Sequence, residues 1–171
     1  IPVAIIGAIS LAAKRGIIVR DPAVLEQADR CSTVIFDKTG TLTYGEPALI
    51  EQIVVPGFES LEVLRLVAGL ERYSKHPLAR SILVCAEAAR LALPPADELS
   101  EPPGQGLVGV IEGRRIQVTK RSKFLLDHAA QSSALPPPAS GLECVIVIDG
   151  KLAATYRFRD APRSDSRPFI E

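Results

Sequence analysis

The sequence predicts an α/β chain, in which one strand of the kind found in parallel sheets precedes an α+β unit made of a helix pair and an antiparallel sheet. Three observations predict this fold class. A short apolar, β-rich run near the start of the chain ends at an aspartate, as strands buried on both faces of a parallel sheet do. Two helical segments follow in tandem. Four strand-like runs then come in pairs joined by two-residue turns, which is typical of an antiparallel sheet.

The first thirty residues predict two helices. Residues 1–13 are almost purely apolar and precede the basic pair Lys14-Arg15. This run is shorter than the ~20 residues that a membrane-spanning helix needs. We therefore expect residues 1–30 to be the cytoplasmic end of a membrane helix and a connecting segment, with an ordinary buried helix as the alternative for the apolar run. A second, short helix is expected over Pro22–Asp29, with Asp21 as its N-cap.

The other expected elements follow from periodicity and turn residues. The strand-like runs are Thr33–Phe36, Ala48–Val55, Leu107–Ile111, Arg115–Val118, Cys144–Ile148 and Leu152–Phe158. The helical segments are Ser60–Tyr73, Pro77–Leu91 and Ser122–Ala130. The turns Glu112-Gly113 and Asp149-Gly150 predict two hairpins, and the proline-rich stretch 132–141 predicts a loop.

Charge and cysteine content exclude two classes of function. The chain carries 20 acidic and 20 basic residues, whereas proteins that bind nucleic acid show a basic excess, so no nucleic-acid partner is expected. Cys31, Cys85 and Cys144 lie far apart and show no Cys-x-x-Cys spacing, which argues against a metal site built from this segment. We expect three reduced and mostly buried thiols.

The string from Asp37 to Thr43 carries the chemistry. An aspartate at the carboxyl end of a buried parallel strand lies where open α/β sheets bind ligands, and its carboxylate is a competent nucleophile toward a phosphoryl group. Because both reactants are anions, their charge must be neutralised, and Lys38 and a Mg²⁺ ion are the natural means. Gly40 supplies a tight turn, and the threonines supply hydroxyls for phosphate oxygens. These residues predict that Asp37 accepts a phosphoryl group.

Over essentially its whole length, the chain resembles the heavy-metal-transporting P-type ATPases, the P1B subfamily, which lie within the haloacid-dehalogenase-like superfamily. The string that begins at Asp37 reads Asp-Lys-Thr-Gly-Thr-Leu-Thr, which is the family's phosphorylation signature. Ser74–Leu78 is similar to the Ser-Glu-His-Pro-Leu motif of the heavy-metal subfamily. Gly104–Gly109 is similar to its Gly-x-Gly element, and Asp160–Arg163 to its Asp-x-x-Arg.

The resemblance implies a domain organisation. Residues 31–45 would form the first part of a haloacid-dehalogenase-like, Rossmann-type phosphorylation domain, which residues 157–171 would reopen. Residues 46–156 would form the inserted α+β nucleotide-binding domain, an antiparallel sheet flanked by a helix pair. The parent protein would lie in a membrane with this region on the cytoplasmic side, and would transport heavy-metal cations through an aspartyl-phosphate intermediate formed from ATP.

The resemblance also implies the catalytic residues. Asp37 would be the nucleophile, assisted by Lys38 and Thr39, and Asp37 and Thr39 would hold Mg²⁺. Phosphatases of the superfamily carry a second aspartate, a general acid/base, at the position of Thr39. Because acid/base catalysis contributes roughly 10²–10⁴-fold, its loss prolongs the phosphoenzyme, as a pump requires. A soluble phosphatase or phosphotransferase of the superfamily is the alternative, and a non-catalytic nucleotide-binding module is a third interpretation.

A second group of residues is assigned to ATP by the resemblance. They are Glu71, His76, Gly104, Gly106, Leu107 and Lys120. His76 stands before Pro77 at a helix N-terminus, where the helix dipole favours a neutral imidazole that can stack on adenine. The glycines would let the backbone approach the nucleotide, and Leu107 would pack on it. The chain departs from the family at Lys75, where a Glu is usual, and at Thr119-Lys120, where Gly-Asn is usual, so Lys120 could pair with a phosphate instead.

Three further residues are assigned by the resemblance to the phosphate and hinge region: Thr41, Asp160 and Arg163. The family's Thr-Gly-Asp and Gly-Asp-Gly-x-Asn-Asp-Ala elements, which hold Mg²⁺ and close the site, do not occur in this sequence. We therefore expect the fragment to bind ATP without turnover. The expected partners are ATP, the actuator domain of the same parent chain, and a heavy-metal ion bound by its membrane part. Copper, zinc, cadmium, lead and cobalt all remain open as that ion.

Overall fold

The computed structural model describes residues 3–162, and all of their side chains except those at positions 38, 39, 161 and 162. The described residues fall into two compact units, which divide between Phe36 and Asp37. Each unit is considered by itself.

The first unit contains the two predicted helices. Helix α1 covers Val3–Lys14, α2 covers Pro22–Gln27, and a 3₁₀ turn, η1, covers Ala28–Arg30. The carboxylate of Asp21 accepts a hydrogen bond from the Ala23 N–H at 2.9 Å, which confirms the predicted N-cap. Between residues 3 and 162, no helix combines the length and the apolar character needed to cross a bilayer.

The strand predicted over Thr33–Phe36 is not formed. These residues have no regular secondary structure, and Ile35 exposes 92% of its surface. A parallel strand exists only through hydrogen bonds to neighbouring strands, and the described part of the chain provides no strand that pairs with this run. The expectation of mostly buried thiols is also wrong for Cys31, which is exposed, although Cys144 is buried.

The second unit is built on one six-stranded antiparallel sheet in the order β1-β6-β5-β4-β3-β2. The strands are β1 (Thr43–Val54), β2 (Asp97–Ser100), β3 (Leu107–Ile111), β4 (Arg114–Thr119), β5 (Leu142–Ile148) and β6 (Lys151–Pro162). The helices are α3 (Ser60–Glu71), α4 (Pro77–Ala88) and α5 (Arg121–Asp127), with the shorter turns η2 (Lys38–Leu42) and η3 (Ala129–Ala134).

Local turn chemistry explains which strands the sequence predicted well. Both residues of Glu112-Gly113 and of Asp149-Gly150 have positive φ, as tight hairpins require, and the two predicted hairpins are confirmed. Strands β1 and β6 run further than predicted because they pair with each other from Thr43↔Pro162 to Val54↔Ala154. Strand β2 was not predicted, since its four exposed residues carry no apolar pattern.

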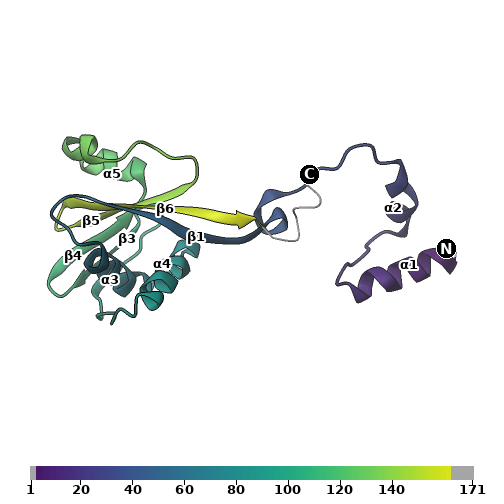
Figure 1. Ribbon diagram of the computed structural model, residues 1–171, viewed down its shortest axis with the longest axis horizontal. Helices are drawn as coiled ribbons and strands as arrows, with labels where there is room; N and C mark the ends of the chain where they lie inside the picture. The colour runs from purple at the N-terminus through teal and green to yellow at the C-terminus, as the bar shows by residue number, and fades with distance from the viewer. Residues whose placement is uncertain (1–2, 163–171) are drawn as a thin grey trace. The chain divides into compact units, whose positions relative to one another are not determined.

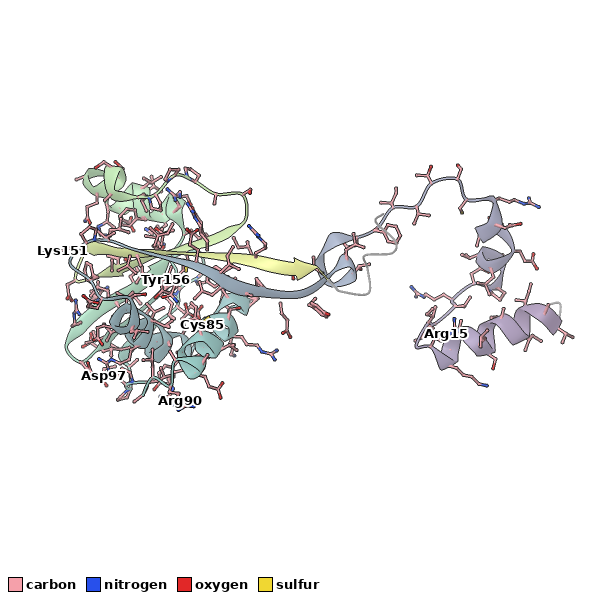
Figure 2. All side chains as sticks on the ribbon, in the orientation of Figure 1. Arg15, Cys85, Arg90, Asp97, Lys151 and Tyr156 are labelled. Atoms are coloured by element: carbon pink, nitrogen blue, oxygen red, sulfur yellow. The ribbon has the colours of Figure 1, made fainter. Side chains whose placement is uncertain are left out.

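Helices cover both faces of the sheet (Figure 1). The pair α3 and α4 packs on one face over the main core, to which the fully buried Tyr156 of β6 and the half-buried Cys85 of α4 belong. Figure 2 shows these two side chains in the layer between α4 and the sheet. Helix α5 places Phe124 on the opposite face against Val145 and Val147. The predicted unit, a helix pair with an antiparallel sheet, is therefore present.

Candidate functional site

The candidate site lies at one end of the sheet, which we call the hinge end. Antiparallel pairing places the starts of β1, β3 and β5 and the ends of β4 and β6 together there, as the pairs Leu107↔Val118, Leu142↔Phe158 and Thr43↔Pro162 show. In Figure 1, β1 and β6 run side by side beyond the other strands toward η2. Segments far apart in the sequence therefore meet at the hinge end.

Helix α3 points its C-terminus at the hinge end. Near its start, Arg65 pairs with Glu112 at the opposite end of the sheet, at 2.6 Å. Near its end, Leu70 lies so close to Gly109 of β3 that a Cβ on this glycine would come within 2.5 Å of it. The turn after α3 is tied to the loop after β2, because the Ser74 hydroxyl donates a hydrogen bond to Glu101 at 2.9 Å.

Glu71, the last residue of α3, is a buried carboxyl group. Only 5% of its surface is exposed, and its Oε2 atom has no hydrogen-bond partner among the residues that the structure describes. Burial and, second, the carboxylate of Glu101 raise the pKa of Glu71 to about 7, although the hydroxyl of Ser74 acts in the lowering direction. An incompletely paired acid in a core is costly, which makes Glu71 a candidate for a functional residue.

His76 caps the next helix. Its Nδ1 accepts a hydrogen bond from the Leu78 N–H at 3.2 Å, and its own N–H donates to the Ser74 hydroxyl at 3.1 Å. Because Nδ1 is an acceptor, the neutral ring carries its proton on Nε2. The cap thus fixes an exposed imidazole, which presents an N–H donor and a ring face at the N-terminus of α4.

The glycine loop before β3 packs tightly on the end of β4. A Cβ on Gly106 would lie 2.2 Å from the Val118 carbonyl oxygen, whereas a Cβ on Gly104 would meet nothing within 4 Å. The Thr119 hydroxyl donates a long, 3.4 Å hydrogen bond to the Gln105 carbonyl. Gly106 is therefore needed for loop packing, while Gly104 keeps an open surface.

The other two residues assigned to ATP at this end differ in exposure. Leu107 belongs to the main core, which leaves 3% of its surface for contact with a ligand. Lys120 is exposed.

Asp160 joins the two long strands at the hinge end. Its carboxylate accepts hydrogen bonds from the Thr43 hydroxyl at 2.5 Å and from the Gly45 N–H at 3.1 Å. Thr43 also accepts a 3.4 Å hydrogen bond from the Gly40 N–H of η2. We call this set of contacts the hinge clasp, since it connects β6, β1 and the turn that follows Asp37.

The phosphorylation string itself is open to solvent. The side chains of Asp37 and Thr41 are exposed, and a buried Asp37 could not have acted as a nucleophile. The side chains of Lys38 and Thr39 and the whole of Arg163 lie outside the described residues. Their roles stay predictions. Residues 3–162 hold no cluster of three or more His, Cys, Asp or Glu side chains that could bind a metal ion.

A groove of about 620 Å³ borders the site between β1 and α4. His76 and Gly45 lie in its lining, but Glu71 and the glycine loop do not. The groove therefore adjoins the predicted nucleotide pocket without containing it.

Sequence reasoning missed Ser74 and Glu101 as members of one contact and Thr43 as part of the clasp. The motif residues were visible in the sequence, whereas Glu101 follows a strand without an apolar pattern. Only the pairing of β2 with β3 brings it to Ser74.

Comparisons with known proteins identify the family. A probable copper-transporting ATPase of Synechococcus is 34% identical over 170 residues, which are 99% of this chain and 21% of that protein. The crystal structure of a zinc-transporting P-type ATPase matches 98% of this chain and 28% of its own, with a TM-score of 0.76 and 31% identity. The structure of the catalytic domain of a CPx-ATPase matches 95% of this chain and 57% of its own, with a TM-score of 0.73 and 25% identity. No family model matches the chain.

The chain belongs to the family of heavy-metal P-type ATPases and matches their catalytic region. It spans about a fifth of the length of the curated ATPases it matches. The agreement with the CPx-ATPase catalytic domain also confirms the predicted α/β fold class, and the superfamily phosphatase alternative is not favoured. The names of the relatives refer to copper in one case and to zinc in another, so membership of the P-type ATPases leaves the transported ion open.

Proposed function

We propose that this chain is the ATP-binding and phosphorylation region of a P-type ATPase that transports heavy-metal cations across a membrane. ATP would bind at the hinge end of the sheet, on the cytoplasmic side, and Asp37 would accept its γ-phosphoryl group. The actuator domain of the parent chain would act on the phosphorylated state, and the metal ion would be bound in the membrane part.

One observation carries the proposal. Three groups lie at the same end of the sheet: a buried carboxyl group whose Oε2 atom has no hydrogen-bond partner among the described residues, a histidine ring held at a helix N-terminus, and an open glycine. These groups suit an adenine base, since Glu71 offers hydrogen bonds to its edge, His76 offers a ring face, and Gly104 leaves room for close approach. A related CPx-ATPase catalytic domain changes conformation upon nucleotide binding, which supports a nucleotide as the ligand.

The hinge clasp connects the sheet that would hold the nucleotide to the turn that follows Asp37. The long pair β1 and β6 leads from the domain that would hold the base to η2, which starts directly after Asp37. A hinge at the clasp would let the γ-phosphate meet the carboxylate, as domain closure does in other enzymes. The domain boundaries proposed above, 31–45, 46–156 and 157–171, fall just inside the start of β1 and within the second half of β6, the parts of these strands that lead to the clasp.

The chemistry at Asp37 is a phosphoryl transfer. A carboxylate oxygen of Asp37 attacks the γ-phosphorus, the bond between this phosphorus and the β,γ-bridging oxygen breaks, and ADP leaves with the bonding electrons. Lys38 would neutralise charge on the transferred group, and Thr41 would donate a hydrogen bond to it. Mg²⁺ is held by one or two carboxylates together with substrate phosphates, and the single exposed carboxylate of Asp37, with Thr39, fits that donor set.

Titration of ATP against the 171-residue chain tests the pocket. We expect Glu71→Ala and His76→Ala each to weaken ATP binding by about ten-fold or more, because each removes a contact to the base. Glu87→Ala and His128→Ala are matched controls, since Glu87 is exposed on α4 and His128 stacks on Phe124 at the other face of the sheet. If the controls weaken binding as much as the site variants, adenine does not bind at the hinge end.

Asp37 is tested in the full-length protein. Asp37→Asn should abolish ATP hydrolysis there while ATP binding to the 171-residue chain persists, because the amide is not a nucleophile. An acid-stable, hydroxylamine-labile phosphate on Asp37 of the isolated chain would contradict the expectation that it binds ATP without turnover.

A further inference from the structure

Glu71 and Glu101 are two acids from segments that meet beside the proposed adenine site. Glu71 ends α3, whereas Glu101 lies in the loop after β2, and the hydroxyl of Ser74 connects the two segments. Glu71 is 5% exposed and its Oε2 is unpaired, while Glu101 is exposed. A buried carboxylate normally has a cation or several donors around it, whereas among residues 3–162 only the Ser74 hydroxyl acts as a donor to Glu71.

The groups that face Glu71 explain why its neutral form is stable. Glu101 approaches from the loop after β2, Ser74 from the turn after α3, and the buried thiol of Cys144 from β5. Behind Cys144 lie Tyr156 of β6 and Cys85 of α4, whose groups are neutral at physiological pH. Within residues 3–162, no cation contributes to the pKa shift of Glu71. Every charged group that acts on it is therefore an anion.

The protonation state decides which base edge Glu71 can bind. A neutral carboxylic acid presents an O–H donor beside a carbonyl acceptor, whereas a carboxylate presents two acceptors. Adenine offers the N1 acceptor beside the N6 amino donor, so it pairs doubly with the acid. With the carboxylate it makes one hydrogen bond and sets the N1 lone pair against an anion. Guanine presents adjacent N1–H and N2–H donors, which suit the carboxylate.

We propose that Glu71 binds adenine as a neutral carboxylic acid and that Glu101 is a positioning residue that keeps it neutral. This inference rests on the proposed function, because it concerns the same ATP site. The phosphates of ATP add negative charge and the base excludes water, and both effects favour the neutral acid further. When Glu71 is ionised in the free protein, ATP binding takes up one proton from solvent.

Glu101 acts on Glu71 in two ways. Its carboxylate opposes ionisation of Glu71, and its hydrogen bond holds the Ser74 hydroxyl at 2.9 Å. Within the described part of the chain, the Ser74 hydroxyl is the one neighbour that lowers the pKa of Glu71. The effect of this hydroxyl on the pKa of Glu71 is smaller than the effects of burial and of Glu101, and among residues 3–162 the Oε2 atom of Glu71 has no hydrogen-bond partner.

Calorimetric titration of the 171-residue chain with ATP and GTP between pH 6 and pH 8, in buffers of different ionisation enthalpy, tests the proposal. From a pKa of about 7 for free Glu71, we expect ATP to bind about ten-fold more tightly at pH 6 than at pH 8. Glu71→Gln should lose this pH dependence, because an amide offers a donor beside an acceptor at every pH in this range. The titration of the ATP phosphates is common to both proteins and cancels in the comparison.

Glu101→Gln separates the effect of charge from that of structure. The amide oxygen can still accept the Ser74 hydrogen bond, but the loss of charge lowers the pKa of Glu71. The pH midpoint of ATP binding should therefore move down, with roughly two- to five-fold weaker binding at pH 8. Glu98→Gln removes an exposed charge from β2 without touching Ser74 and should leave the midpoint unchanged. The preference for ATP over GTP should fall as the pH rises.

The possible outcomes are distinct. Tighter ATP binding at pH 8 than at pH 6, together with a loss of binding in Glu71→Gln, would show that the carboxylate binds the base and would overturn the inference while the proposed function stands. Absence of ATP binding at every pH would instead remove the proposed function. Carboxyl-carbon NMR of Glu71 in the unmodified chain gives an independent readout, because ATP should raise the pKa of this group.

Discussion

The glycine loop before β3 offers a matched pair of substitutions, Gly104→Ala and Gly106→Ala. The two glycines have nearly the same backbone conformation, with φ of +76° and +86°. Their surroundings differ. A Cβ at position 104 would meet nothing within 4 Å, whereas a Cβ at position 106 would lie 2.2 Å from the Val118 carbonyl oxygen and 3.0 Å from the Thr119 Cα.

The expected loss of stability follows from these two quantities. An alanine with positive φ is disfavoured by roughly 1–2 kcal/mol, and this cost applies equally at both positions. At position 106 the clash is with backbone atoms of β4, which cannot rotate away, so overpacking adds about 1–3 kcal/mol. We therefore expect Gly104→Ala to lose about 1–2 kcal/mol of unfolding free energy and Gly106→Ala about 2–5 kcal/mol.

Equilibrium urea unfolding of both variants measures the difference at constant m value. Because no nucleotide is present, the result does not depend on the role assigned to the loop. Amide exchange should also quicken at the ends of β3 and β4 in Gly106→Ala alone. Equal destabilisation of the two variants would refute the close approach of Gly106 to β4 and, with it, the packing of the loop described here.

Three further predictions concern other parts of the structure. Tyr156→Phe removes a buried hydroxyl that has no hydrogen-bond partner within residues 3–162, so it should stabilise the chain by about 1–2 kcal/mol in urea unfolding. A loss of stability would show that the hydroxyl does have a partner. Asp160→Ala removes the acceptor of the hinge clasp, so it should lower the unfolding free energy by about 1–3 kcal/mol and speed the hydrogen exchange of the Gly45 amide. The control Asp127→Ala breaks a salt bridge on α5 and should lower the unfolding free energy by less than about 0.5 kcal/mol. The pKa of Glu71 is raised from 4.5 to about 7 on folding, so its contribution to stability is complete below pH 4.5 and is lost as the pH rises to 7. The unfolding free energy of Glu71→Gln, relative to that of the unmodified chain, should therefore rise by up to about 3 kcal/mol between those pH values. Parallel stability curves for the two proteins would contradict the raised pKa.

Elements stabilised by local interactions were predictable from the sequence. Asp21 and Pro22 mark a helix start, and Glu112-Gly113 and Asp149-Gly150 mark hairpins, because a cap or a two-residue turn needs only neighbouring residues. Strand β2 was not predictable, since its four exposed residues are held by pairing to β3 alone. The apolar run before Asp37 was misread for the converse reason, because apolar residues form a parallel strand only beside other strands.

The candidate site shows the same division. The phosphorylation string, the His-Pro motif and the two glycines are contiguous patterns. The sequence alone was therefore enough to place the chain in its family and to propose Asp37, Glu71 and His76 as site residues. The burial of Glu71, its contact with the Ser74–Glu101 link and the hinge clasp of Asp160 join residues that are 27 to 117 positions apart. Such contacts depend on strand order and register, which arise from cooperative packing of the whole sheet, so only the tertiary structure decided them.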